Sequence, residues 1–367
     1  MPSYPPARVG MTLDDVDTPA LILDLDAFEA NLRRLNESLA GSSVAVRPHA
    51  KSHKCPQIAM RQIALGAVGV CCQKVTEAEA LVAGGVQDVL VTNELVGAKK
   101  VERLAALARH AKIGVCVENV HNIAALVQAG YQGDVYIELE IGMRRCGVEP
   151  GEPAVALARS ITGAKGLRFA GLHAYHGRAQ HVRSMDERHG LIERAAQHVV
   201  HTKRLLEHAG MPCPLVTGAG SGTYMLEVET GVWDEIQPGS YIFMDRDYGL
   251  NEWAAPLPRF EHSLFVVASV MSAGTDRAIV DAGLKASSVD SGMPGIWQRP
   301  GLTYKSASDE HGWVEIGAGT PPPALGEKLW LVPGHCDPTV NLYDWYVCVR
   351  GGVVEALWPI TARGALR

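Results

Sequence analysis

The sequence predicts an α/β fold, a (β/α)8 TIM barrel followed by an antiparallel β domain. Short β-branched runs alternate with longer segments of helical period from residue 20 to about residue 217. These runs are continuously hydrophobic, which is typical of a parallel sheet covered by helices. From about Glu261 strands follow one another without long helices, which indicates a separate antiparallel domain. A chain of 367 residues has room for a barrel of about 250 residues and a smaller second domain.

The pattern of each element gives the expected order along the chain. The expected barrel strands are residues 20–23, 44–47, 69–72, 88–92, 113–117, 135–140, 169–173 and 215–217. The expected helices are residues 28–39, 56–65, 76–83, 98–109, 119–129 and 187–208. In the second domain we expect strands at 263–271, 277–282, 328–332 and 345–350. We therefore predict a barrel over residues 18–260, and a β-rich domain made of residues 1–17 and 261–367.

Composition and charge exclude several classes of protein. Hydrophobic residues make up 47% of the chain and charged residues 20%, which is the balance of a globular protein with a large core. The net charge of −6 provides no basic surface, so we expect neither nucleic acid nor a membrane surface as a partner. The N-terminus lacks a signal-peptide pattern, and the eight cysteines lack zinc-ribbon spacing. We expect a cytoplasmic protein with free thiols.

A dense group of ionisable residues follows the expected strand at 44–47. The sequence there is Arg-Pro-His-Ala-Lys-Ser-His-Lys, with Lys51 at its centre. A lysine in a surface loop is usually just solvated. A barrel mouth can instead desolvate an amine, lower its pKa and make it a Schiff-base nucleophile. Lys51 is therefore a candidate nucleophile.

Two further polar groups follow later strands. Gly142–Gly147 contains the arginine pair Arg144 and Arg145, which by itself is also typical of a solvated turn. His173–His181 contains three histidines and a tyrosine at a strand end, and this density favours a functional site over single core histidines.

Two glycine-rich loops are candidates for binding a phosphate. Residues 217–223 (TGAGSGT) follow one strand directly, and residues 237–241 (QPGSY) come one strand later. Small residues leave backbone N–H groups free to surround a phosphate, and loops after the last barrel strands often do so. The sequence has no Walker motif and no glycine triad after the first strand, so a small phosphorylated cofactor fits better than a nucleotide.

The last cluster is Gly334-His335-Cys336-Asp337-Pro338. If strand geometry persists there, His335 and Asp337 project to one side and Cys336 to the other. One nitrogen and one oxygen ligand suit manganese, magnesium or zinc. A turn stabilised by Asp before Pro explains the same residues equally well.

Taken together, these stretches resemble the D-threonine aldolase family, within the barrel-type pyridoxal-phosphate enzymes (fold type III) that include alanine racemase. The resemblance runs from about Asp17 to Gly364. Its most specific pieces are DTPALILDLDAFEANL, RPHAKSHKCP, GVCCQKVTEAEA, RRCGV, AYHGRAQH, GSYIFMDRDYG, VDAGLK, DEHG and GHCDPT. The stretch VPGHCDPTVNLYDWYV looks especially similar to the D-3-hydroxyaspartate aldolases of the same group.

The resemblance implies a homodimer with bound pyridoxal phosphate and a role for each matching residue. Lys51 matches the Schiff-base lysine, Arg145 the arginine near the cofactor phenolate, and His181 the proposed base. Tyr175 lies by the cofactor ring in the family, and His335 and Asp337 match the metal ligands. The residues that match phosphate and cofactor contacts are Gly218, Gly220, Ser221, Gly222, Thr223, Gly239, Ser240 and Tyr241.

The activity implied is cleavage of a D-3-hydroxy-amino acid to glycine and an aldehyde. Alternatives are a D-3-hydroxyaspartate aldolase, which releases glycine and glyoxylate, and a D-serine or 3-hydroxyaspartate dehydratase. The related dehydratases carry His-x-Cys at the metal site, whereas this chain has His-Cys-Asp. A racemase is a less suitable alternative, because metal ligands would have no role in racemisation. A pyridoxal-phosphate carrier without turnover would resemble only the barrel.

Overall fold

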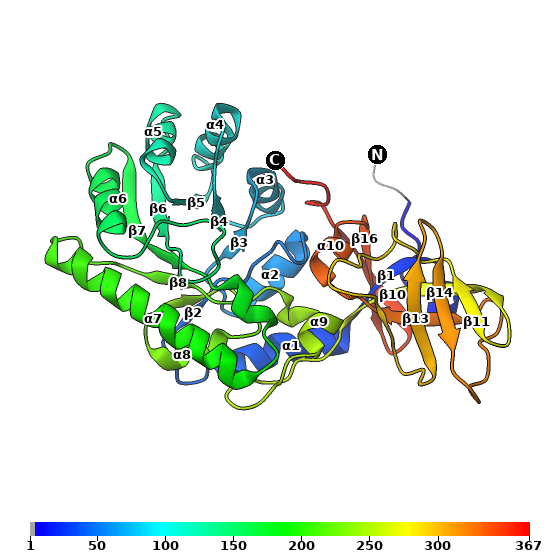
Figure 1. The fold of residues 1–367 in the computed structure, drawn as a ribbon. Helices are drawn as coiled ribbons and strands as arrows, with labels where there is room; N and C mark the ends of the chain where they lie inside the picture. Colours follow the sequence, from blue (N-terminus) through cyan, green and yellow to red (C-terminus); the bar gives the residue numbers. More distant parts are fainter. Residues whose placement is uncertain (1–3) are drawn as a thin grey trace.

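Eight parallel strands form one of the two sheets in the structure, a computed structural model that describes residues 4–367 (Figure 1). These strands are β2 (Ala45–Val46), β3 (Val70–Cys72), β4 (Asp88–Glu94), β5 (Lys112–Val117), β6 (Gly133–Glu138), β7 (Leu167–Ala174), β8 (Val216–Gly218) and β9 (Glu235–Ile236). They are ordered β2-β9-β8-β7-β6-β5-β4-β3. A parallel bridge between His49 and Cys71 joins the two end strands and closes the barrel. The predicted (β/α)8 barrel is confirmed.

Helices cover the outside of this barrel (Figure 1). They are α2 (Pro56–Ala64), α3 (Val75–Ala83), α4 (Ala98–Leu107), α5 (Val120–Gln128), α6 (Glu152–Thr162), α7 (Met185–His208) and α8 (Tyr224–Thr230), whereas the short α9 (Arg246–Gly249) packs against the turn at residues 177–181. Short 3-10 turns are η1 (Leu13–Asp15), η2 (Gly177–His181) and η3 (Ser240–Ile242). The longest helix, α7, begins where the side chain of Ser184 accepts a hydrogen bond from the N–H of Glu187, a common N-cap. Its buried residues include Ile192 and Val199, which face the barrel.

The second sheet is mixed rather than purely antiparallel. Its strands are β1 (Ala20–Asp24), β10 (Leu264–Ala273), β11 (Arg277–Val280), β12 (Gly295–Ile296), β13 (Leu302–Ala307), β14 (Gly312–Ile316), β15 (Lys328–Val332), β16 (Trp345–Arg350) and β17 (Val353–Pro359). Its main path runs β13-β14-β11-β10-β1-β16-β17. Helix α10 (Cys336–Val340) also lies in this region, whereas α1 (Leu25–Ser38) runs from β1 to the barrel, where Ser38 bonds to Tyr224 of α8 at 2.7 Å and Asn36 donates to the carbonyl of Leu65 after α2 at 3.0 Å.

Strand β1 corrects the sequence prediction, which placed residues 20–23 in the barrel. The structure puts β1 between β10, to which it is antiparallel, and β16, to which it is parallel. Leu21 and Leu23 pack into one hydrophobic cluster, while Ala20 and Ile22 pack into another on the opposite face. A strand that is buried on both faces has the same apolar pattern in either sheet, so the pattern did not reveal which sheet it joins.

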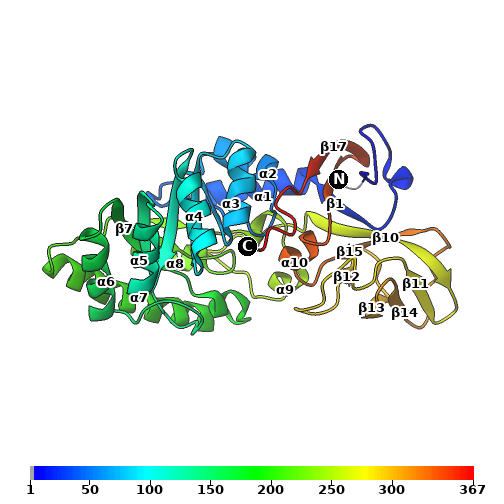
Figure 2. The ribbon, with the colours of Figure 1, turned by 90° about the horizontal axis from the view of Figure 1, so that it is seen from above.

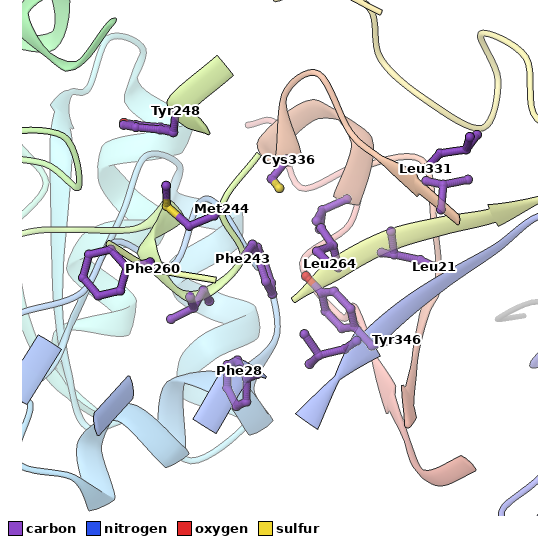
Figure 3. Close-up of a cluster of buried hydrophobic side chains, with 14 of the residues drawn as sticks. Leu21, Phe28, Phe243, Met244, Tyr248, Phe260, Leu264, Leu331, Cys336 and Tyr346 are labelled. Atoms are coloured by element: carbon purple, nitrogen blue, oxygen red, sulfur yellow. The ribbon is translucent and has the colours of Figure 1, made fainter. Parts of the chain in front are cut away.

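One hydrophobic core joins the two parts of the molecule (Figure 3). Phe243, which follows η3 at the barrel, packs against Tyr346 of β16 with ring centroids 5.8 Å apart. The hydroxyl of Tyr346 donates a hydrogen bond to the carbonyl of His53 at 2.8 Å. Figure 2 shows α10 at the junction between the barrel and the second sheet. The junction therefore brings the turn before α10 to the barrel.

No helix within residues 4–367 combines the length and the apolar character needed to cross a membrane.

Candidate active site

A cavity of about 270 Å³ lies where the loops after the barrel strands meet the turn before α10. It is lined by His49, Lys51, Gln73, Thr92, Met143, Arg145, His173, Tyr175, Gly177, Arg178, His181, Gly220, Ser221, Gln237, Gly239, Ser240, Tyr248, His335 and Asp337. All three predicted catalytic residues and both predicted metal ligands are therefore in one place. The loops lie at the carboxyl ends of the strands, which is where barrel enzymes carry their active sites.

Lys51 extends into this cavity from the loop after β2. Its side chain is 37% exposed, and its Nζ lies 3.8 Å from Oδ2 of Asp337. Burial lowers the pKa of Lys51, but nearby groups, above all the negative charge of Asp337, raise it more, so the net direction is upward. This direction differs from the lowered pKa that the sequence suggested, because Asp337, which is far away in the sequence, comes close to the amine in the fold.

Four residues of the two glycine-rich loops line the cavity and have backbone N–H groups without an acceptor in the described part of the chain. They are Gly220 and Ser221 after β8, and Gly239 and Ser240 after β9. None of the four N–H groups donates to an acceptor anywhere in residues 4–367. Buried N–H groups are nearly always paired, so a cradle of free donors fits an anionic group such as a phosphate.

Four other residues expected at the cofactor do not line the cavity: Gly218, Gly222, Thr223 and Tyr241. The N–H of Gly222 already donates to Oε1 of Gln180 at 2.9 Å. Tyr241 is a core residue whose hydroxyl accepts a hydrogen bond from Gln62 at 3.1 Å. In the structure Tyr241 supports the first loop, because its N–H donates a hydrogen bond to Oγ of Ser221 at 2.9 Å.

Arg145 and Tyr175 meet at one wall of the cavity. The guanidinium of Arg145 lies over the Tyr175 ring at 5.8 Å, within reach of a cation–π contact. It also lies 3.6 Å from Oε1 of Glu138, whose Oε2 is 3.3 Å from Nδ1 of His173. Burial lowers the pKa of His173, but the charge of Glu138 raises it more. An Arg–Glu–His chain of charges therefore runs beneath this wall.

His181 is held by a carboxylate that the sequence did not single out. Its Nδ1 lies 2.5 Å from Oδ2 of Asp247, and Asp247 also pairs with Arg183. Burial raises the pKa of Asp247, but the hydrogen bonds from His181 and Arg183 lower it to about 2. An ionised Asp247 accepts the Nδ1 proton of His181, which leaves Nε2 to exchange a proton with a ligand.

The turn with His335 and Asp337 does not continue the strand geometry that the sequence predicted. His335 is extended and is the N-cap residue of α10, and Asp337 lies in the first turn of that helix. The two side chains nevertheless both reach the cavity, while Cys336 is 0% exposed. The helix begins here because Oδ2 of Asp245 accepts the N–H of Cys336 at 3.0 Å.

The two side chains of this turn fit a divalent cation. Nδ1 of His335 pairs with Oδ2 of Asp290 at 2.8 Å, which leaves Nε2 as the free ligand atom. Oδ1 of Asp337 is buried and has no hydrogen-bond partner among residues 4–367. A buried carboxylate oxygen without a partner is costly, and a bound cation would satisfy it.

Sequence reasoning missed the carboxylates that orient the site, namely Glu138, Asp245, Asp247 and Asp290. Asp245 and Asp247 stand in GSYIFMDRDYG, a stretch that was noted only for its resemblance. Each has at least one partner far away in the sequence, namely His173 for Glu138, Cys336 for Asp245, His181 for Asp247 and His335 for Asp290, so local pattern did not indicate its role.

Comparison with known proteins agrees with this architecture. The barrel matches the family described as alanine racemase, N-terminal domain, over residues 23–247, and the second part matches the putative serine dehydratase domain over residues 263–349. The fold and site thus define an alanine-racemase-like barrel protein with an added β-rich part. The chain belongs to the D-threonine aldolase family within this class.

Three relatives illustrate the similarity. A D-threonine aldolase from Arthrobacter sp is 51% identical over 99% of this chain and 97% of the relative. A 3-hydroxy-D-aspartate aldolase from Paracoccus denitrificans (strain Pd 1222) is 44% identical over 98% of this chain and 95% of the relative. The crystal structure of D-threonine aldolase from Filomicrobium marinum superimposes with a TM-score of 0.96 at 51% identity, covering 99% of this chain and 100% of that one.

Proposed function

We propose that this chain is a lyase that uses pyridoxal phosphate and a divalent metal to cleave D-3-hydroxy-amino acids of the D-threonine type into glycine and an aldehyde. The proposal rests on the set of residues that line one cavity. Lys51, the four loop residues whose N–H groups have no acceptor among the described residues, and the His335–Asp337 pair all line it. Relatives named as aldolases at 51% and 44% identity support the same reaction.

The cofactor would be held from three sides. Lys51 would bind its aldehyde carbon through the amine, and the N–H groups of Gly220, Ser221, Gly239 and Ser240 would bind its phosphate. Arg145 would pair with the phenolate, and Tyr175 would lie by the ring. Bound pyridoxal phosphate supplies an electron sink beside the substrate Cα.

The metal and His181 would act together on the substrate 3-hydroxyl. His335 and Asp337 would hold manganese, magnesium or zinc, and a cation there lowers the pKa of a bound hydroxyl. Nε2 of His181 would take the hydroxyl proton while Asp247 stabilises the resulting imidazolium. The C–O⁻ electrons would then form the aldehyde carbonyl as the Cα–Cβ bond breaks, and the bonding pair would stay on the glycine carbon, which would then take up a proton.

A 3-hydroxyaspartate aldolase is the second candidate, because one relative bears that name and the reaction differs only in the substrate side chain. A dehydratase fits less well. The related dehydratases place a cysteine at the second metal position, whereas this chain has Asp337 there and buries Cys336. A carrier without turnover would have no use for the His335–Asp337 turn.

The test is incubation of the purified protein with D-threonine, D-phenylserine and D-3-hydroxyaspartate, with and without chelator. Glycine plus an aldehyde supports the proposal, whereas ammonia plus a keto acid identifies a dehydratase. Lys51→Ala should abolish the Schiff-base absorbance, and the exposed control Lys100→Ala should retain it. His335→Ala should keep the absorbance and lose turnover, and the exposed control His311→Ala should keep both. Unchanged turnover in His335→Ala would remove the metal from the proposal.

We also propose a cytoplasmic homodimer, which the family resemblance supports. Light scattering on the eluted holoenzyme tests the assembly, and a mass near 39.4 kDa, that of one chain, would contradict it.

A further inference from the structure

Arg178 differs from the other cationic groups that line the cavity, because it has no carboxylate partner within residues 4–367. The other pairs are Lys51 with Asp337 at 3.8 Å, Arg145 with Glu138 at 3.6 Å, His181 with Asp247 at 2.5 Å, and His335 with Asp290 at 2.8 Å. His173 also pairs with Glu138, at 3.3 Å.

The last imidazole ring in the cavity lining, that of His49, is neutral. Burial and the charge of Lys51 hold the pKa of His49 well below its ordinary value. Arg178 is therefore the cation free to pair with a ligand.

The 3-10 turn η2 positions Arg178 beside the proposed base. Residues three apart in a 3-10 helix lie on the same side, and Arg178 and His181 are three apart. Nδ1 of His176 caps the turn by accepting the N–H of Ala179 at 3.3 Å. Gly177 lets the turn pack closely, since a Cβ there would lie 2.6 Å from the Met143 side chain. The turn thus directs Arg178 and His181 to the same cavity.

The remaining groups of the cavity already have tasks under the proposed function. Arg145 would serve the cofactor phenolate, Lys51 its aldehyde carbon, and the His335–Asp337 pair the metal. Every amino acid substrate also brings a carboxylate at Cα, and 3-hydroxyaspartate brings a second one. An arginine is the side chain best suited to a carboxylate, because its planar N–H groups match the two oxygens.

We infer that Arg178 binds a carboxylate of the substrate and thereby selects amino acids, and fixes their orientation, at the cavity mouth. The inference rests on the proposed function for the identity of the substrate. Arg178 is a binding residue that acts before the bond-breaking step, so its loss should raise KM much more than it lowers kcat.

A binding experiment tests this without turnover. The holoenzyme is titrated with D-alanine and with D-alaninamide, which has a neutral carboxamide in place of the carboxylate, and the cofactor absorbance is followed. Neither compound has a hydroxyl on the carbon next to Cα, so neither can be cleaved. In the wild type the Kd of D-alaninamide should exceed that of D-alanine by about 10- to 100-fold, which corresponds to the loss of one charge-assisted hydrogen-bonded pair. In Arg178→Gln this ratio should fall close to one, and Arg178→Lys should recover part of it.

Arg194→Gln is the matched control. Arg178 and Arg194 both lower the pKa of His176 by their charge, but Arg194 does not line the cavity. Arg194→Gln therefore removes an equal charge nearby and should keep the wild-type ratio. A fall in both variants would show a general field effect and overturn a direct contact.

Turnover distinguishes the two carboxylates. If Arg178 binds the carboxylate at Cα, Arg178→Gln should raise KM for D-threonine and D-3-hydroxyaspartate by the same factor. If it binds the side-chain carboxylate, only KM for D-3-hydroxyaspartate should rise, and the alanine ratio should stay unchanged. The inference fails if neither the ratio nor either KM changes. Absence of cleavage in the wild type would refute the proposed function alone, because the alanine titration would still report on Arg178.

Discussion

At the scale of single residues, the site depends on carboxylates that hold other side chains. Asp247 shows this most directly, because it accepts the Nδ1 proton of His181 and is itself held by Arg183. These contacts lower its pKa to about 2, so it stays ionised at any ordinary working pH. His181 is therefore kept in the tautomer whose Nε2 can accept a proton.

Asp247→Asn should lower kcat by about 10- to 100-fold, the usual cost of losing a group that orients a catalytic ligand or base. The amide keeps the shape of the side chain but removes the charge that stabilises the His181 imidazolium. The cofactor absorbance should not change, because Asp247 does not line the cavity. Steady-state kinetics and absorbance spectra check both points. Asp309→Asn, an exposed change far along the chain, should leave kcat as in the wild type.

Asp245 connects two short elements and carries a second prediction. It is 0% exposed; its Oδ1 accepts the N–H of Tyr248 in α9 at 2.9 Å, and its Oδ2 accepts that of Cys336 in α10 at 3.0 Å. Asp245→Ala should lower the free energy of unfolding by about 1–3 kcal/mol, because two buried N–H groups lose their acceptor. It should also raise the metal concentration needed for half-maximal activity, since α10 carries Asp337.

Asp24→Ala is the control for that experiment. Asp24 caps α1 by accepting the N–H groups of Asp26 and Ala27, and it lies outside the cavity lining. It should cost stability without changing the metal requirement. If both variants need the same metal concentration for half-maximal activity, Asp245 does not influence the turn that carries His335 and Asp337.

Helix α8 contains a buried acid that makes stability depend on pH. Burial raises the pKa of Glu227 to about 8, although Thr223 donates a hydrogen bond to it at 2.8 Å. Between about pH 4.5 and about pH 8 the unfolded chain ionises this group while the folded protein keeps it protonated. Rising pH in this window therefore favours unfolding, by at most about 1.4 kcal/mol per pH unit. Glu227→Gln should remove this slope.

Chemical denaturation at several values between pH 5 and pH 8 measures that slope. Glu229→Gln, on the exposed side of the same helix, should keep the wild-type slope. An identical slope in Glu227→Gln would show that Glu227 is ionised in the folded protein.

The hydrophobic periodicity of the sequence predicted the positions of most helices and strands, but not which strands pair with one another. Strands β3 to β8 and helices α2 to α5 lie within a few residues of their predicted ranges, because each has a continuous local pattern. The mixed nature of the second sheet was missed, since β1 gains its parallel neighbour β16 from more than 300 residues away. We propose to keep a domain boundary near residue 261 but to assign β1 to the second part.

For the whole molecule, a shared core predicts that the two parts unfold together. Tyr346 packs on Phe243 and bonds to the carbonyl of His53, so it touches both parts at once. Tyr346→Ala should lower the free energy of unfolding by about 3–5 kcal/mol, as for other large buried aromatic residues. Calorimetry should show one transition at a lower temperature. Tyr4→Ala, at a side chain that is 97% exposed, should leave the transition unchanged, and two separate transitions in the wild type would contradict a shared core.

The sequence by itself predicted the barrel, and its motifs singled out Lys51 and the turn that carries His335 and Asp337. These features are local, because a strand pattern or a short motif is written in neighbouring residues. Only the tertiary structure decided which sheet takes β1, which N–H groups at the cavity have no acceptor within residues 4–367, and which carboxylates hold His181, His335 and α10. Those contacts join residues far apart in the chain, and their energies depend on burial and distance, which no local pattern records.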